Sequence, residues 1–185
     1  MSSSLVGSEM CIRDRKYTNP TELLTENLSV SPVVGLEDAN IFSEIDALKI
    51  VFCDGVFNPD LSDDLTAENI IISRLEENGD LHWAKNYYGL LEEKAQRPVS
   101  RSLAALNTAI ASDGALIHVK GKVEKPILIL GTRNNTAEAI LHHVIKVEKD
   151  CSITLLESGP FAKRLNSVME AVSYTHLTLP TMMSV

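Results

Sequence analysis

In the stretch Leu141-His142-His143-Val144-Ile145-Lys146-Val147, three of the four alternate positions 141, 143, 145 and 147 are apolar, and the residues between them are more often polar. Successive side chains of a strand point to opposite faces, so this pattern predicts a β-strand with one buried face. The same alternation occurs in Ala115–Val119 and again from Ile153 onward. Between them, Val123–Leu130 is a further strand region, with Pro126 at its start or on an edge.

These predicted strands are short, and polar turns such as 131–136 separate them without intervening helices. That arrangement favours stacked β-rungs or a β-sandwich over a sheet of alternating strands and helices. In a parallel β-helix, each rung buries its inward residues against the next rung. The sequence therefore predicts a mainly β protein, with both architectures open at this point.

The segment before this region also contains strand signals. Leu48–Cys53 is rich in strand-forming residues, and Asp54-Gly55 after it suits the positive φ angles of a tight hairpin turn. Val56-Phe57 then begins a return strand, so we expect a β-hairpin. Residues 63–77 are ambiguous, because their isoleucines favour a strand and their closing Leu75-Glu76-Glu77 favours the end of a helix.

Two helices are expected near 81–112. Within 81–94, one helical face is formed by Trp83, Tyr87, Leu90 and Leu91. After Pro98, the Ser100 hydroxyl can cap a second helix, which Asp113-Gly114 ends. One face of that second helix is shared by Leu103, Leu106 and Ile110.

Composition restricts the class of protein. The chain has 185 residues, of which 44% are hydrophobic and 23% charged, and its formal net charge is −8. Such an acidic chain repels phosphate backbones, so we expect no nucleic-acid partner. No run of about 18 apolar residues is present, so we expect no membrane partner. Three cysteines without a C-x-x-C motif favour a reducing compartment, and we expect a cytoplasmic protein.

Both ends of the chain resemble translated transposon-adapter sequence. The codons ATG TGT ATA AGA GAC encode Met10-Cys11-Ile12-Arg13-Asp14, and their reverse complement encodes Val172-Ser173-Tyr174-Thr175-His176. Unrelated protein segments would rarely be reverse complements over their whole length. We therefore expect residues 1–15 and 172–185 to be artefactual tails, and the protein proper to be truncated at both ends.

Between these tails we expect two regions. Residues 16–45 are polar and would be a linker or the remnant of an N-terminal helical region. Residues 46–171 would contain the β core together with the helices near 81–112.

The histidines are the first candidates for chemistry. His142-His143, with Cys151 nearby, has the residue types of a metal site. Adjacent residues of a strand point to opposite faces, however, so both imidazoles cannot easily bind one ion. We expect paired or surface histidines here and no metal. His118 lies between Ile117 and Val119, and we expect it on a solvated strand face.

The cysteines and acidic residues offer little more. Cys53 is expected to be a small hydrophobic residue of the core, and Cys151 has no assignable histidine–carboxylate partner. The group Asp60, Asp63 and Asp64 lacks the spacing of a calcium loop. The pairs Glu76-Glu77 and Glu92-Glu93 are expected to be solvated. Because no glycine-rich phosphate loop is present either, we assign no catalytic, cofactor-binding or metal residue and expect a protein without enzymatic activity.

Three segments in fixed order carry a resemblance to a known family: Ala105-Leu106-Asn107-Thr108-Ala109, Asp113–Val119 and Val123-Glu124-Lys125-Pro126-Ile127. They resemble the SufB/SufD family of iron–sulfur cluster assembly scaffolds, and its SufD branch in particular. The likeness extends more weakly from Ile41 to Glu157. The turn Val119-Lys120-Gly121 is shorter than the family's, a change that turns tolerate.

The resemblance implies a right-handed parallel β-helix, with a helical segment before it. It also implies a complex with a SufB-like paralogue and a SufC-like ABC-type ATPase, on which the iron–sulfur cluster is assembled. In the family, the ATPase-docking helices and the cluster-assembly residues lie toward the C-terminal part, so no cofactor is expected on this fragment.

Two other functions remain open from the residues alone. The first is a carbohydrate-active β-helix enzyme, which would need charged residues stacked at equivalent rung positions. The positions of Asp113, Glu124 and Glu138 do not recur at a steady spacing, which counts against it. The second is a β-sandwich binding module.

Overall fold

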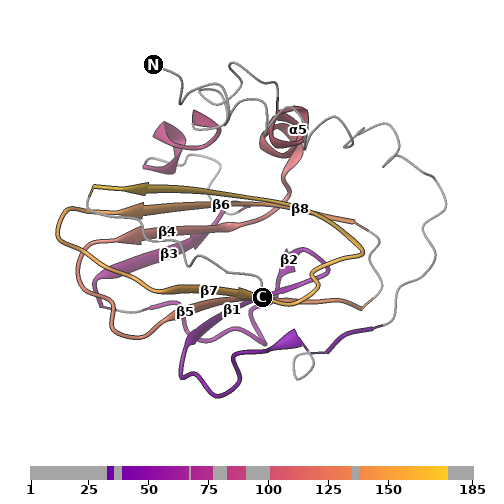
Figure 1. Cartoon of the computed structure of the whole chain (residues 1–185), viewed down its shortest axis with the longest axis horizontal. Helices are drawn as coiled ribbons and strands as arrows, with labels where there is room; N and C mark the ends of the chain where they lie inside the picture. Colours follow the sequence, from indigo (N-terminus) through magenta and orange to yellow (C-terminus); the bar gives the residue numbers. More distant parts are fainter. Residues whose placement is uncertain are drawn as a thin grey trace, which may run out of the picture.

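The computed structural model describes residues 33–35, 39–66, 68–76, 83–90, 101–134 and 138–174. This part of the chain is mainly β and forms two four-stranded mixed sheets that lie face to face, with helix α5 (Ser102–Ile110) on the outside of one of them (Figure 1). The prediction of a mainly β protein is confirmed.

The first sheet has the strand order β2-β1-β5-β7. Its strands are β1 (Leu48–Cys53), β2 (Val56–Phe57), β5 (Ile127–Thr132) and β7 (Leu155–Ser158). The pair β1 and β2 is antiparallel, and its turn has positive φ at Asp54 and Gly55, so the expected hairpin is confirmed. Strands β1, β5 and β7 run parallel.

The second sheet has the order β3-β4-β6-β8. Its strands are β3 (Ile70–Arg74), β4 (Ala115–Val119), β6 (Glu138–Val147) and β8 (Arg164–Ser173). The ambiguous segment 63–77 therefore contains a strand, β3, which runs antiparallel to β4. Strands β4, β6 and β8 run parallel.

From β4 onward the chain alternates between the two sheets. Strands β4, β6 and β8 lie in the second sheet, and β5 and β7 in the first. Leu116 pairs with Val144 and Ile127 with Leu155, each 28 positions further along the chain. Glu138 pairs with Arg164, 26 positions further along. Each pass through a sheet therefore lies beside the previous pass through that sheet.

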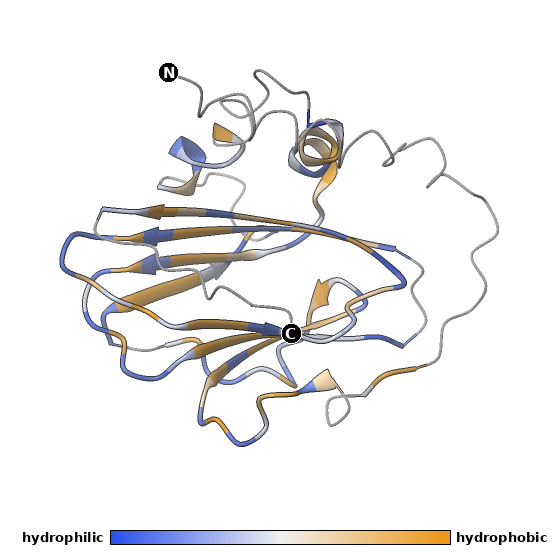
Figure 2. Cartoon of the chain, in the orientation of Figure 1, coloured by the Kyte–Doolittle hydropathy of each residue, from blue (hydrophilic) through white to orange (hydrophobic). Residues whose placement is uncertain are grey.

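The main core fills the space between the sheets. It contains the inward residues that the alternating pattern predicts in β4 and β6, and Figure 2 shows how apolar residues follow both sheets. Its buried members include Ile50, Phe52, Ala115, Ile117, Val119, Ile127, Ile129, Leu141, Ile145 and Phe161. Burying such a side chain stabilises the fold by about 1.5–3 kcal/mol.

Both sheets are also covered on their outer faces. Val51, Leu128 and Leu130 of the first sheet pack against Ala39 and Phe42. On the second sheet, Leu116 and Val144 pack against the segment Trp83–Tyr88. Strands β4 and β5 are consequently buried along their whole length, as is typical of parallel strands with two covered faces.

The helices differ from the prediction for 81–94. The described part of that segment forms a short 3₁₀ helix at Ala84–Asn86, and the backbone turns at Gly89, which has a φ of 74°. A positive φ is incompatible with a continuing α-helix, so the predicted helix is wrong there. Trp83 and Tyr87 nevertheless face the sheet. Leu91 and Ser100 lie outside the described residues.

The second predicted helix is present as α5, but it buries a different face. Leu106 and Ile110 are 43% and 51% exposed, whereas Asn107 is fully buried against the second sheet. Asn107 forms side-chain hydrogen bonds to that sheet, and these fix the face that α5 turns toward it.

The expected turn at 131–136 begins later than predicted, since Gly131 and Thr132 belong to β5.

The expected boundaries fall partly outside the described residues. This applies to residues 1–15, to most of 16–45 and to 175–185. Within the described part, Val34 forms an antiparallel bridge with Arg133, and β8 continues to Ser173, two residues beyond the expected boundary at Ala171. None of the helices in the described ranges is both long and apolar enough to cross a bilayer.

Candidate functional site

His142 and His143 point to opposite faces of β6, as adjacent strand residues must. Both side chains are fully buried, so neither is a surface histidine. His142 faces α5, and His143 faces the core between the sheets, where its ring meets Phe52 edge-on at 5.6 Å. The structure therefore gives the two imidazoles separate environments.

A buried polar network surrounds His142. Its Nδ1 lies 2.9 Å from Oδ1 of Asn107, and its Nε2 lies 3.0 Å from Oε2 of Glu170 on β8. The Tyr88 ring packs on the imidazole at a centroid distance of 4.1 Å. The same Glu170 oxygen accepts the backbone N–H of Gly89 at 2.6 Å. Each ring nitrogen of the imidazole is thus satisfied by the protein.

Asn107 links α5 to two strands through this network. Its Nδ2 donates to the carbonyl oxygens of Leu141 at 2.9 Å and Asn166 at 2.8 Å. These two acceptors fix the orientation of the carboxamide, so Oδ1 accepts from the Nδ1–H of His142. The network connects α5, β6, β8 and the 83–90 segment, and its role is therefore structural.

His143 is held differently. The backbone N–H of Ala115 donates to its Nδ1 at 3.0 Å, so the proton of the neutral ring is on Nε2. That Nε2 has no hydrogen-bond partner among the described residues. Burial, and to a lesser extent the neighbouring His142, lower the pKa of His143 to about 4. His143 is therefore a neutral core residue at pH 7.

Asp113 organises the start of β4. Its carboxylate accepts the backbone N–H groups of Phe57 at 2.9 Å and Gly114 at 2.8 Å. Nη2 of Arg74 lies 3.1 Å away and also contacts Glu76, and the guanidinium lies over the Phe57 ring. These contacts connect β2, β3 and β4, which is a structural role for a buried acidic residue.

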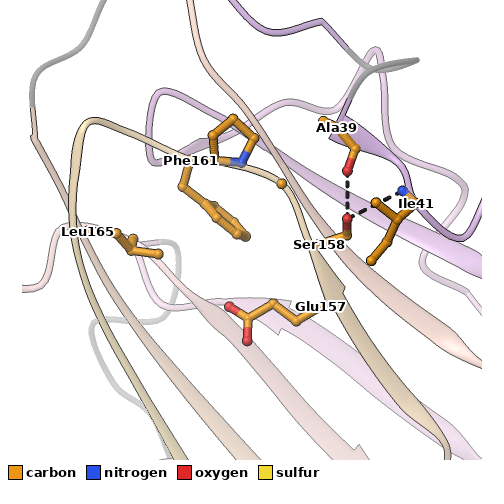
Figure 3. A pocket seen from close by; sticks show the side chains of 8 residues that line it. Ala39, Ile41, Glu157, Ser158, Phe161 and Leu165 are labelled. Atoms are coloured by element: carbon orange, nitrogen blue, oxygen red, sulfur yellow. Dashed lines mark hydrogen bonds between the residues drawn. The ribbon is translucent and has the colours of Figure 1, made fainter. Parts of the chain in front are cut away.

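The described part also contains an open pocket of about 590 Å³ beside β7. Its lining includes the Glu157 carboxylate, which Figure 3 shows turned toward Leu165, with the Phe161 ring on the same side of the pocket. The Ser158 hydroxyl donates to the Ala39 carbonyl at 2.6 Å and accepts from the N–H of Ile41 at 3.5 Å. Partial burial raises the pKa of Glu157.

The expectation for His118 is wrong. Its side chain does face away from the main core, but it is 8% exposed, because Trp83 covers it at a ring distance of 5.1 Å. Its Nε2 lies 2.8 Å from Oε1 of Glu148, which also contacts Lys146 at 2.6 Å. Alternation predicted the strand face correctly, and a segment distant in sequence covers that face.

Neither Cys53 nor Cys151 belongs to the hydrogen-bonded groups around His142, Asp113 and His118. Cys53 is half-buried at the end of β1, outside the core clusters, and its sulfur accepts a hydrogen bond from Nδ2 of Asn134, so its expected core position is wrong. Cys151 packs at the edge of the core. Among the described residues, no group of three or more histidine, cysteine, aspartate or glutamate side chains is placed to hold a metal ion.

The acidic residues near 60 have local roles. Asp63 accepts the backbone N–H of Lys49 at 2.8 Å, and Asp64 accepts from the backbone and hydroxyl of Thr66. These hydrogen bonds lower the pKa of Asp64. Glu76 is exposed and contacts Arg74, whereas Glu77, Glu92 and Glu93 lie outside the described residues.

Sequence reasoning missed the groups that complete these arrangements: Asn107, Glu170, Arg74 and Glu157. Asn107 lies in one of the segments that carry the family resemblance, but nothing in the sequence indicates its contacts, and no motif contains the other three, because each meets its neighbours through contacts between distant segments. A scan against protein-family models found no match for the chain, and neither did a search of curated protein sequences.

Proposed function

We propose that this chain is part of a scaffold subunit of an iron–sulfur cluster assembly complex of the SufBCD type, built on a right-handed parallel β-helix. In this proposal the subunit is cytoplasmic and has no catalytic activity of its own. A SufC-like ABC-type ATPase supplies nucleotide hydrolysis, and a SufB-like paralogue is the second scaffold. The iron–sulfur cluster is the cargo of the whole complex.

The observation that carries the proposal is the register of the parallel strands. Pairs such as Leu116 with Val144 and Ile127 with Leu155 repeat at 28 positions, and Glu138 with Arg164 at 26. A chain that returns beside its previous pass at a nearly constant interval is what successive coils of a β-helix require. A β-sandwich is built from antiparallel strands, so this register favours the β-helix.

The segments that carry the SufB/SufD resemblance also occupy consistent places. Residues 105–109 lie in α5, Asp113-Gly114 lead into β4, and Pro126 immediately precedes β5. Pro126 uses its carbonyl to accept the N–H of Leu48, so the proline starts a strand without losing a ladder hydrogen bond. In the proposed β-helix these segments would lie at the entry to the first coil, and this consistent placement supports the proposed family.

The placement of polar groups supports a scaffold over a carbohydrate-active enzyme. Such an enzyme would need carboxylates stacked on neighbouring coils, yet the register partner of Glu157 is Ile129, a core residue. The polar network around His142 is buried and satisfied within the protein.

Co-purification tests the proposed function. The tagged chain is co-expressed with the SufB-like and SufC-like proteins. An unrelated ABC ATPase is co-expressed as the control. We expect the SufB-like protein to be retained, together with the SufC-like ATPase bound to it, and the control to be lost. If the chain is folded by circular dichroism and retains neither partner, the proposed function is wrong.

A further inference from the structure

The pocket beside β7 has the size of a small-molecule site. Its volume of about 590 Å³ lies within the range in which drug-sized ligands bind. Its walls are formed mainly by apolar groups of Ala39, Ile41, Pro160, Phe161 and Leu165. A ligand with a hydrocarbon body would therefore bury apolar surface here.

The polar group of the pocket is unusual for its position. Glu157 pairs in register with Ile129, whose side chain is fully buried in the core, so the Glu157 side chain is on the inward-facing side of β7. Among the described residues, no hydrogen bond or ion pair satisfies its carboxylate. The residue is nevertheless exposed at the open pocket, so its carboxylate, with apolar walls beside it, is accessible to a cation from solution.

The geometry of the walls is fixed by the backbone. Gly159 has a φ of 100°, and a Cβ there would lie 2.0 Å from the Gly131 carbonyl oxygen. The turn then inserts the Phe161 ring into the core, against Phe52. The two hydrogen bonds of Ser158 attach the Ala39–Ile41 segment to β7. A pocket whose walls are already ordered loses less entropy on binding.

We propose that this pocket binds a small organic cation, a primary ammonium on an apolar body, with the ammonium on the Glu157 carboxylate and the body against Phe161 and Leu165 (Figure 3). The ammonium supplies a positive charge and hydrogen-bond donors to this carboxylate, which no side chain of the described residues pairs. The apolar walls take up the hydrocarbon part. This site is separate from the scaffold function and does not depend on it.

The test uses 2-phenylethylammonium as the probe and the full chain, with binding followed by isothermal titration calorimetry. Two analogues serve as ligand controls: 2-phenylethanol, which is uncharged, and phenylacetate, which is an anion. We expect Glu157→Gln to weaken binding of the ammonium at least about tenfold, because a charge-assisted hydrogen bond is lost. Glu124→Gln removes the same charge from an exposed glutamate outside the pocket and should leave binding unchanged.

A second variant acts from the opposite wall. Leu165→Lys introduces an ammonium on the residue toward which the Glu157 carboxylate turns, and we expect it to abolish binding of the probe. Circular dichroism confirms that each variant is folded. The proposal is overturned if 2-phenylethanol binds as tightly as the ammonium, if Glu157→Gln binds it within about twofold of the parent, or if no binding occurs at about 10 mM probe.

Discussion

Replacement of Asn107 by alanine removes the connection between α5 and the second sheet. Asn107 is fully buried, and its amide donates to the carbonyls of Leu141 and Asn166 while its oxygen meets Nδ1 of His142. In Asn107→Ala, these three groups stay buried, because the rest of the network holds them in place. The substitution therefore leaves polar groups unsatisfied in the interior.

The expected loss follows from these contacts. Each neutral hydrogen bond to a carbonyl contributes about 0.5–1.5 kcal/mol net, and an unsatisfied buried donor such as the His142 Nδ1–H costs about 1–3 kcal/mol. Together they lower the free energy of unfolding by about 3–4 kcal/mol. That is a large share of the stability of a typical domain, so the variant should be close to unfolding at 37 °C.

The matched control lies next to it on α5. Thr108 has a buried hydroxyl without a hydrogen-bond partner among the described residues, so Thr108→Val should leave stability unchanged or raise it. Urea unfolding followed by circular dichroism measures both variants. The reasoning is refuted if Asn107→Ala unfolds within about 1 kcal/mol of the parent, or if Thr108→Val is the more damaging change.

Three further predictions concern pH and backbone geometry. Because burial lowers the pKa of His143 from 6.5 to about 4, the folded state binds fewer protons there than the unfolded state. The free energy of unfolding at pH above 6.5 should therefore fall by about 3 kcal/mol as the pH drops to 4. The variant His143→Leu should remove most of this loss, as measured by urea midpoints at both pH values. Because burial raises the pKa of Glu157, its contribution is lost as the pH rises above about 4.5, so Glu157→Gln should be more stable than the parent at pH 7 and equal to it at pH 3, by thermal melting. Gly159→Ala should lower the melting temperature strongly, because of its positive φ and the Gly131 carbonyl, whereas Gly35→Ala, with open space around it, should not.

Strand positions were predictable because their cause is local. In β4 and β6, alternate residues are apolar with the exception of His143, and those apolar residues pack in or against the main core. The hairpin between β1 and β2 was predictable for a similar reason, since Asp54-Gly55 supplies the two positive φ angles of its turn. Strand β8 was missed, because its residues Leu165, Val168 and Met169 do not alternate.

The burial of outer faces was not predictable, because it depends on distant segments. Alternation placed His118 correctly on the face opposite Ile117, but the cover is Trp83, which lies 35 positions earlier in the chain. The orientation of α5 has the same origin. Apolar spacing favoured Leu106 and Ile110 as its buried face, while the hydrogen bonds of Asn107 to β6 and β8 determine the observed one.

The polar clusters could not be predicted from the sequence, for a related reason. His142, Asn107 and Glu170 come from three elements separated by 28 residues or more, and no spacing rule connects them. The opposite directions of His142 and His143 were nevertheless predictable, since they follow from the geometry of a single strand.

The most direct test of the account is an NMR measurement of which strands are neighbours. With methyl-labelled isoleucine and leucine, the account predicts nuclear Overhauser contacts between Ile117 and Ile145 and between Leu128 and Leu156, the register partners on non-consecutive parallel strands. Antiparallel pairing of consecutive strands, with contacts from β4 to β5 and from β5 to β6 in place of these, would contradict the observed strand register and the proposed scaffold function that rests on it.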